Sequence, residues 1–74
     1  MTMLEIAQQV SERTGVTLEA MRSLSTEHRV ARARHAAMVE MRRAGKWSTT
    51  QIGRLFNRDH STVTYAERRY GGRG

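Results

Sequence analysis

The sequence predicts an all-α domain, a small bundle of about five helices that contains a helix-turn-helix. Three observations predict it. Proline is absent from the 74 residues. Apolar side chains recur in several segments at the spacing of a helix that buries one face. Residues typical of helix caps stand at the ends of these segments, whereas no segment of useful length alternates in the manner of a strand.

The composition restricts the class of protein. Leu, Ile, Val and Phe number 12 residues, or 16% of the chain, a share close to that of disordered proteins. Five Met and eight Ala raise the apolar share to 38%, so a small core is possible. The absence of cysteine excludes a disulfide framework and a thiolate metal site. No apolar run reaches the roughly 20 residues that span a bilayer, and no signal peptide is present, so we expect a cytoplasmic protein.

The charge is distributed unevenly along the chain. Thirteen Lys and Arg against seven Asp and Glu give a net charge of +6. Residues 1–28 contain two basic and four acidic side chains, a net of −2, whereas residues 29–74 contain eleven basic and three acidic ones, a net of +8. A basic face fits a polyanionic partner, but it fits a solvated surface as well. The motifs must decide between the two.

A first helix is expected from about residue 3 to residue 13. Thr2 and Glu5 form a capping box at its start, and Gly15 suits the left-handed residue that ends it. The apolar face of this helix consists of Ile6, Ala7 and Val10. That face either packs on a later helix or forms an interface. Because the rest of the chain has too little apolar surface to fold alone, we favour packing in the core.

A short second helix and a longer basic helix follow. Thr17 can cap the second helix, which would run through Leu18, Met21 and Leu24 to a polar break at residues 25–28. The third helix is expected from about residue 29 to residue 44. Its apolar stripe consists of Val30, Ala33, Ala37, Met38, Met41 and Ala44. Most of its basic side chains lie outside that stripe.

Two more helices are joined by a tight break. Ser48 and Gln51 form a second capping box, and the fourth helix would span residues 49–56. Asn57 suits the left-handed conformation that such a break needs. Asp59 would cap the fifth helix at residues 60–70, with Val63, Ala66 and Tyr70 pointing inward. Gly53 costs about 1 kcal/mol inside a helix, which indicates a close approach of the other helix.

This pair of helices matches a helix-turn-helix, whose second helix enters the DNA major groove. Short polar side chains at its first turn let the backbone approach the bases, and Asp59, His60 and Ser61 are suited to read them. Asp59 also fits a simple capping role, and the two roles are compatible because a carboxylate has two oxygens. The expected phosphate contacts are Arg32, Arg34, Lys46, Thr50, Arg54, Arg58 and Thr62. A solvated surface role remains an alternative for Arg54 and Arg58.

The stretch TQIGRLFNRDHSTV at residues 50–63 resembles the signature of the C-terminal DNA-binding domain of the bacterial replication initiator DnaA. The stretch VARARHAAM at residues 30–38 is similar to the basic helix of that domain, and the resemblance covers most of residues 10–70. The resemblance implies an all-helical domain that binds a short duplex site as a monomer. It implies base contacts by Asp59, His60 and Ser61, and phosphate contacts by Thr62 and Arg34.

The sequence departs from the family pattern at three places. Thr26 stands where the family has an arginine that enters the minor groove, and His28 and Arg29 are nearby candidates to replace it. The turn at Asn57 is one residue shorter, and Thr50 replaces a proline. In the initiator this domain closes a long chain behind an ATPase. Here we expect a stand-alone protein or an N-terminal domain, with residues 1–70 as the DNA-binding domain and 71–74 as a flexible tail or the start of a linker.

These observations lead to one main hypothesis, namely sequence-selective binding of double-stranded DNA by a nucleoid-associated transcriptional regulator. Initiator-like box binding, or competition with the initiator, is the first alternative. A protein-interaction adaptor on the same scaffold is the second. An enzyme is not expected, because consecutive residues such as Asp59 and His60 diverge by about 100° on a helix and form no catalytic relay. We expect no metal, cofactor, nucleotide or membrane, and other protein domains only through a longer chain.

Overall fold

The computed structural model describes residues 1–70, and the expected tail at 71–74 lies outside them. The described residues form five helices and no strand, which confirms the all-α prediction. The helices are α1 Met3–Thr14, α2 Leu18–Arg22, α3 His28–Ala44, α4 Thr49–Leu55 and α5 His60–Tyr70. Each observed boundary lies within two residues of the expected one.

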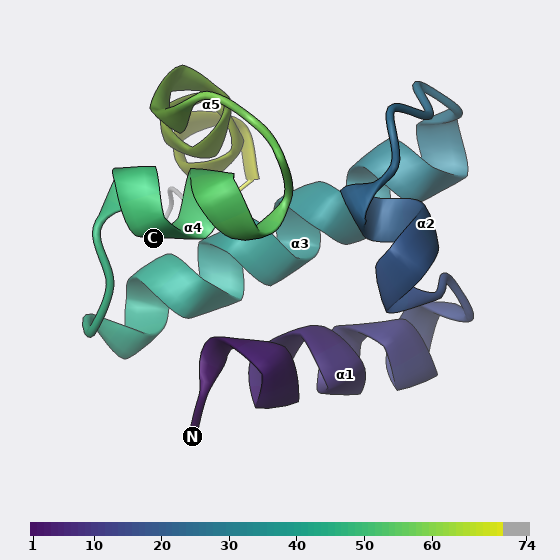
Figure 1. Cartoon of the computed structure of the whole chain (residues 1–74), viewed down its shortest axis with the longest axis horizontal. Coiled ribbons are helices and arrows are strands. Elements are labelled where there is room, and N and C mark those ends of the chain that lie inside the picture. The colour runs from purple at the N-terminus through teal and green to yellow at the C-terminus, as the bar shows by residue number, and fades with distance from the viewer. Residues whose placement is uncertain (71–74) are drawn as a thin grey trace.

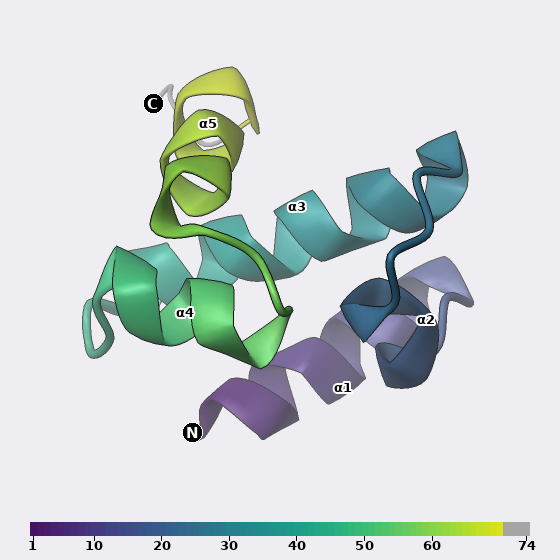
Figure 2. The same ribbon diagram turned by 45° about the horizontal axis from the view of Figure 1, so that its top comes forward.

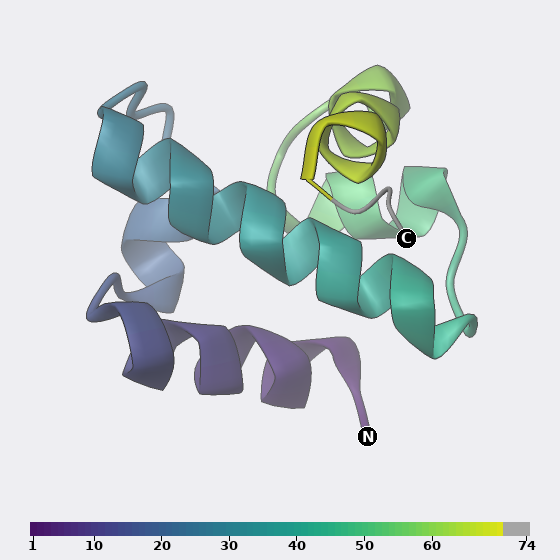
Figure 3. The ribbon, with the colours of Figure 1, turned by 180° about the vertical axis from the view of Figure 1, so that it is seen from behind.

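Helix α3 is the central element of the fold. It crosses the molecule with α1 on one side and α4 and α5 on the other, while α2 packs beside its first half (Figure 1). The view from behind shows the same order, with α3 between α1 and the α4–α5 pair (Figure 3). Because α3 is covered on more than one side, its buried surface is wider than a single stripe. Val39, which lies outside the expected stripe, is buried for this reason.

The first helix packs in the core rather than forming an interface of its own. Ile6, Ala7 and Val10 are buried in one cluster with residues of α3, including Ala33 and Met38. Both capping boxes are present, at the starts of α1 and α4. These local signals explain why the helix boundaries were predictable, since a cap involves only residues close in sequence.

Three expected core positions are exposed. Helix α2 ends at Arg22, and the Ser23 hydroxyl donates to the Ala20 carbonyl at 2.6 Å, so the chain leaves the helix before Leu24, which is 83% exposed. Ala44 is exposed because it is the last residue of α3, just before the chain turns at Gly45. Tyr70 is 47% exposed at the end of α5.

Candidate nucleic-acid interface

A tight turn holds the start of α5 against α4. Asn57 has a φ of 57°, the left-handed conformation expected for it. The Arg58 backbone N–H donates to the Gly53 carbonyl at 2.8 Å. A Cβ atom on Gly53 would lie 2.6 Å from the Arg58 carbonyl oxygen. The close approach to Gly53 therefore comes from the turn that precedes α5, and the backbone of α5 itself is not the contact.

The first turn of α5 presents short polar side chains to solvent. The Asp59 and His60 side chains are 70% and 61% exposed, and Ser61 is exposed as well. The Ser61 hydroxyl donates to Asp59 Oδ2 at 2.7 Å, and His60 Nδ1 lies 3.3 Å from Asp59 Oδ1. Figure 2 shows α5 above α4 and α3, with no other helix over its far side. The predicted base-reading residues are thus brought together at an accessible helix start.

Hydrogen bonds stabilise the ionised form of the Asp59 carboxylate. The Ser61 hydroxyl, and then the Ser61 backbone N–H, lower the pKa of Asp59 below its ordinary value, and His60 adds to the effect. The group therefore accepts hydrogen bonds at neutral pH, as a contact to a cytosine amino group would require. The hydrogen bonds that the Asp59 carboxylate accepts within the first turn of α5 also match the N-cap role that the sequence allows.

The exposed face of α5 continues beyond the first turn. Tyr65 and Arg68 follow Ser61 by four and seven residues, so the three side chains share one face. Tyr65 is 54% exposed, and its ring meets the edge of the His35 ring at a centroid distance of 5.8 Å. Neither Tyr65 nor Arg68 is among the site residues predicted from the sequence. Their helical spacing from Ser61 was the signal that could have found them.

His35 is held between two tyrosine rings. Its ring stacks on Tyr70 at a centroid distance of 5.5 Å, and its Nδ1 is buried without a hydrogen-bond partner among residues 1–70. Burial lowers the pKa of His35 below its ordinary value, and the nearby charges of Arg34 and Arg58 lower it further. The imidazole is therefore neutral at neutral pH. It packs on Tyr65 and Tyr70 and so supports α5.

Most of the expected phosphate-contacting side chains are exposed. Arg32 lies on α3 and Lys46 in the turn before α4, while Thr50 and Arg54 lie on α4. Thr62 is half-buried in the first turn of α5. These positions are spread over α3, α4, the turn before α4 and the first turn of α5.

Arg34 is placed differently from the expectation. It is 4% exposed, and its Nε donates to the Met21 carbonyl at 2.7 Å while Nη2 donates to the Ser25 carbonyl at 2.9 Å. These bonds take up the guanidinium inside the fold, so Arg34 holds the chain between α2 and α3 and does not face a phosphate. Arg58 is half-buried and shares this role, because its Nη2 donates to the Ser23 carbonyl at 3.0 Å.

The two candidates for the minor groove lie in the first turn of α3, and both are exposed. Arg29 turns toward the end of α1, where its Nη2 donates to the Gly15 carbonyl at 3.4 Å. His28 has no such bond to the described residues. Thr26 is exposed in the loop before α3. Of the two candidates, His28 is therefore the one that the fold leaves available beside this loop.

Two structural features are absent from residues 1–70. No helix in this part of the chain is long and apolar enough to cross a membrane. No group of three or more His, Cys, Asp or Glu side chains in the same residues could hold a metal ion.

Comparison with known proteins agrees with the helix-turn-helix geometry of α4 and α5. A family model described as "Bacterial dnaA protein helix-turn-helix" matches residues 3–69. The chain belongs to this family. It is 39% identical over 62 residues to the chromosomal replication initiator protein DnaA of Picosynechococcus sp., a match that covers 82% of this chain and 14% of that protein. The match spans about a seventh of the relative's length.

Family membership confirms the resemblance on which the sequence analysis relied. Residues 3–69 are a DnaA-type helix-turn-helix domain, and a domain of this type is a DNA-binding module rather than a catalytic one. The turn at Asn57, shorter by one residue, still forms a tight connection. Thr50 is exposed in the first turn of α4, where it replaces the family's proline without disturbing the capping box.

Proposed function

We propose that this domain binds double-stranded DNA sequence-selectively by placing the first turn of α5 in the major groove. The observation that supports this proposal is the exposed, short polar turn formed by Asp59, His60 and Ser61, which the packing at Gly53 holds clear of the core. A major groove admits one α-helix, and bulky side chains at this turn would keep the backbone away from the bases.

Each base-reading side chain has a suitable chemistry. The ionised Asp59 carboxylate can accept from a cytosine amino group, while His60 can donate to an acceptor on guanine or thymine. Ser61 can reach a base or a phosphate. Tyr65 extends the same face by one turn, so we include it as a contact to the groove.

Exposed basic and hydroxyl side chains supply the phosphate contacts. We assign these contacts to Arg32, Lys46, Thr50, Arg54 and Thr62, and to the part of Arg58 that the fold leaves accessible. The positive end of the α5 dipole adds to the attraction for nearby phosphates. If about six phosphates are neutralised, the logarithm of affinity falls with the logarithm of salt concentration at a slope near −5.

The biological role that we propose is control of transcription at the bound sites. A second candidate is binding of replication-initiator boxes, and the identity to a replication initiator favours it. The 74 residues contain no phosphate-binding loop for ATP. In either role, we therefore propose that they contribute DNA binding and no ATP-driven step. We place the domain with the nucleoid in the cytoplasm.

Selection of bound duplexes from a random pool tests the proposal. An enriched motif is expected, and its similarity or dissimilarity to initiator boxes separates the two roles. No enrichment, with equal affinity for every duplex, would remove the sequence-reading part of the proposal. No DNA binding even at low salt, together with a stable protein partner, would favour the protein-interaction adaptor instead.

Substitutions then test the two kinds of contact. His60→Ala should cost roughly 1–3 kcal/mol on the selected motif and little on random DNA, because it removes a base contact. Arg54→Gln should weaken both complexes and reduce the salt slope by about 1. Gln9→Ala, at an exposed position on α1, is the control and should change neither.

A further inference from the structure

An apolar groove of about 730 Å³ lies between the start of α1 and α4. It exists because α1 and α4 both pack on α3 rather than on each other. Figure 1 shows the start of α1 at the same end of the molecule as α4. The apolar side chains that line the groove come from both helices and from the segments just before them, and they are Met1, Met3, Leu4, Trp47 and Leu55.

Much of this apolar lining faces solvent. Leu4 is 55% exposed and Met1 is 60% exposed, while Trp47 and Leu55 are half-buried. The chain has four leucines, and two of them line the groove, although its small core needs apolar side chains. A contiguous exposed apolar surface marks an interaction site, and Trp and Met are enriched in protein interfaces. The groove is therefore suited to a protein partner.

Two cations flank the apolar lining. Arg22 and Lys46 are the charged residues of the groove, and no carboxylate lines it. Arg22 Nε donates to the Leu55 carbonyl at 2.7 Å, which places this side chain at the end of α4. Lys46 precedes the start of α4, and its Nζ lies 6.0 Å from the centroid of the Trp47 ring. The two positive charges therefore stand at opposite ends of the α4 wall, which is about 10 Å long.

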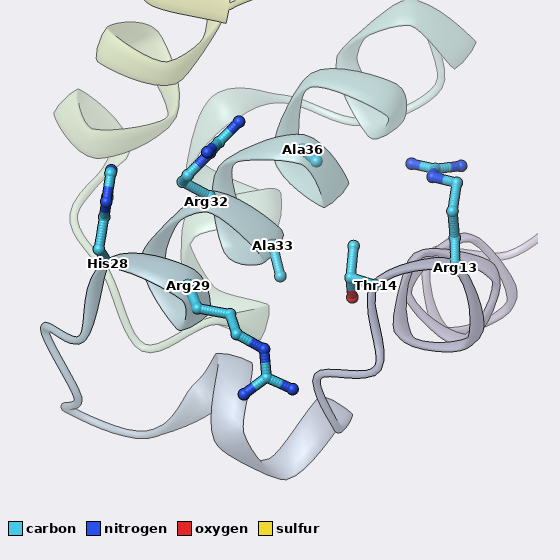
Figure 4. A pocket seen from close by; sticks show the side chains of 7 residues that line it. All are labelled: Arg13, Thr14, His28, Arg29, Arg32, Ala33 and Ala36. Atoms are coloured by element: carbon cyan, nitrogen blue, oxygen red, sulfur yellow. The ribbon is translucent and has the colours of Figure 1, made fainter.

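The groove differs in chemistry from the cleft at the other end of α1. That cleft is lined by Arg13, Arg29 and Arg32 (Figure 4), so charge dominates its lining. In the groove, apolar side chains separate two cations, and a sugar-phosphate backbone has no apolar group to cover them. An occupant with both large apolar groups and negative charges fits the groove better than a nucleic acid does.

We propose that the groove binds an amphipathic helix of a partner protein, with two acidic side chains seven residues apart and large apolar side chains between them. Seven residues of helix rise by about 10 Å, which matches the length of the α4 wall. Residues at i, i+3, i+4 and i+7 share one face of a helix. The carboxylates at the ends of that face would pair with Arg22 and Lys46, and the apolar side chains between them would cover Leu4 and Trp47.

This inference is independent of the proposed function, because it needs no DNA. Lys46 is also among the phosphate contacts proposed above, so a partner helix and DNA would share this residue. Arg22 is not among those contacts. Failure of DNA binding would therefore leave the groove proposal standing, and failure of the groove proposal would leave sequence-selective DNA binding standing.

A synthetic peptide tests the proposal on the whole domain. The probe is an alanine-based helix of about 14 residues with two Glu seven residues apart and two Leu midway between them. Trp47 is the single tryptophan of the chain, so its fluorescence reports occupancy of the groove. We expect a saturable shift of the emission to shorter wavelength as the ring leaves water. A control peptide with Lys in place of both Glu should bind about tenfold more weakly, and equal binding of the two peptides would overturn the proposal.

Substitutions separate the apolar and the charged contacts. Leu4→Gln changes an exposed side chain and should weaken binding of the acidic peptide about tenfold. Arg22→Gln should weaken it about twofold to fivefold, and the difference should vanish in about 1 M salt. Arg13→Gln is the matched control at the other end of α1 (Figure 4) and should change nothing. Unchanged affinity in both Leu4→Gln and Arg22→Gln would refute the proposal.

Sedimentation of the protein alone tests the other occupant that the groove could hold, a second copy of this chain. We expect a monomer at concentrations from about micromolar to millimolar. A dimer that Leu4→Gln dissociates and Arg13→Gln does not would show that a second copy fills the groove, and it would overturn the assignment to a partner helix.

Discussion

The substitution Gly53→Ala tests how α4 and the turn before α5 are packed. Helix propensity alone predicts that alanine stabilises this position by about 1 kcal/mol over glycine. The structure predicts the opposite sign. The new Cβ would lie 2.6 Å from the Arg58 carbonyl oxygen and 3.3 Å from the Asp59 carbonyl, where ordinary contact begins at 3.4 Å.

Arg58, whose carbonyl meets this Cβ, is held by hydrogen bonds of its backbone and of its side chain. The Arg58 N–H donates to the Gly53 carbonyl at 2.8 Å, and the Arg58 side chain donates to the Ser23 carbonyl at 3.0 Å. Overpacking of this kind costs about 1–3 kcal/mol or somewhat more. Because the 2.6 Å contact is with a backbone atom, we place the cost near the upper end, at about 3 kcal/mol, so that the net loss after the gain in propensity is about 2 kcal/mol. For a domain of this size that loss lowers Tm by about 8–16 °C.

Thermal unfolding followed by circular dichroism measures the effect. Arg54→Ala, at an exposed position of the same helix, is the control and should shift Tm by little. Because the turn also places Asp59, Gly53→Ala should reduce the preference for the selected motif more than the affinity for random DNA. A rise in Tm for Gly53→Ala would refute the reasoning, since it would show that nothing packs against Gly53.

Three further predictions follow from buried or strained groups. Arg34→Met should lower the free energy of unfolding in urea by about 2–3 kcal/mol because buried carbonyls lose their donor, whereas Arg43→Met should have little effect. Asn57→Val should cost about 1–2 kcal/mol in the same assay because its φ is 57°, and Asn57→Gly should cost less. Since the folded pKa of His35 lies below its ordinary value of 6.5, the unfolded chain binds the proton first, so stability should fall as the pH drops below about 6.5. His35→Gln should remove that part of the fall and His28→Gln should not, and the same slope in both variants would contradict the prediction.

The parts of the fold that could be predicted depend on residues close in sequence. The capping boxes at Thr2 and Ser48 and the left-handed residues Gly15 and Asn57 each act within a few residues. The sequence therefore shows where helices begin and end. The exposed, polar first turn of α5 was predictable for the same reason, because Asp59 stands at the start of a strongly periodic segment.

The parts that could not be predicted depend on contacts between distant segments. Leu24 has the helical spacing of a core residue, but no distant segment covers it, and it is 83% exposed after the end of α2. Tyr70 has the spacing of Val63 and Ala66, yet it lies at the end of α5, where stacking on His35 is the contact that it makes. Periodicity identifies a helix face, and it does not show where the neighbouring helix stops covering that face.

Arg34 shows the same difference and connects the fold to the site. From sequence, an arginine on a basic helix looks like a phosphate ligand, and only the arrangement of α2 brings three carbonyl groups to it. Arg34 Nη2 and Arg58 Nη2 lie 3.4 Å and 3.0 Å from the same Ser23 carbonyl oxygen, so two positive charges lie close together. Burial lowers the pKa of Arg34, and the charge of Arg58 lowers it further. Both cations are tolerated because they bond to carbonyl oxygens that would otherwise lack donors. Since Arg58 directly precedes Asp59, this shared carbonyl ties the loop between α2 and α3 to the turn before α5, which carries Asp59. Two arginines that the sequence predicts as phosphate contacts thus hold the loop between α2 and α3 and the turn before α5 in a fixed relation to each other.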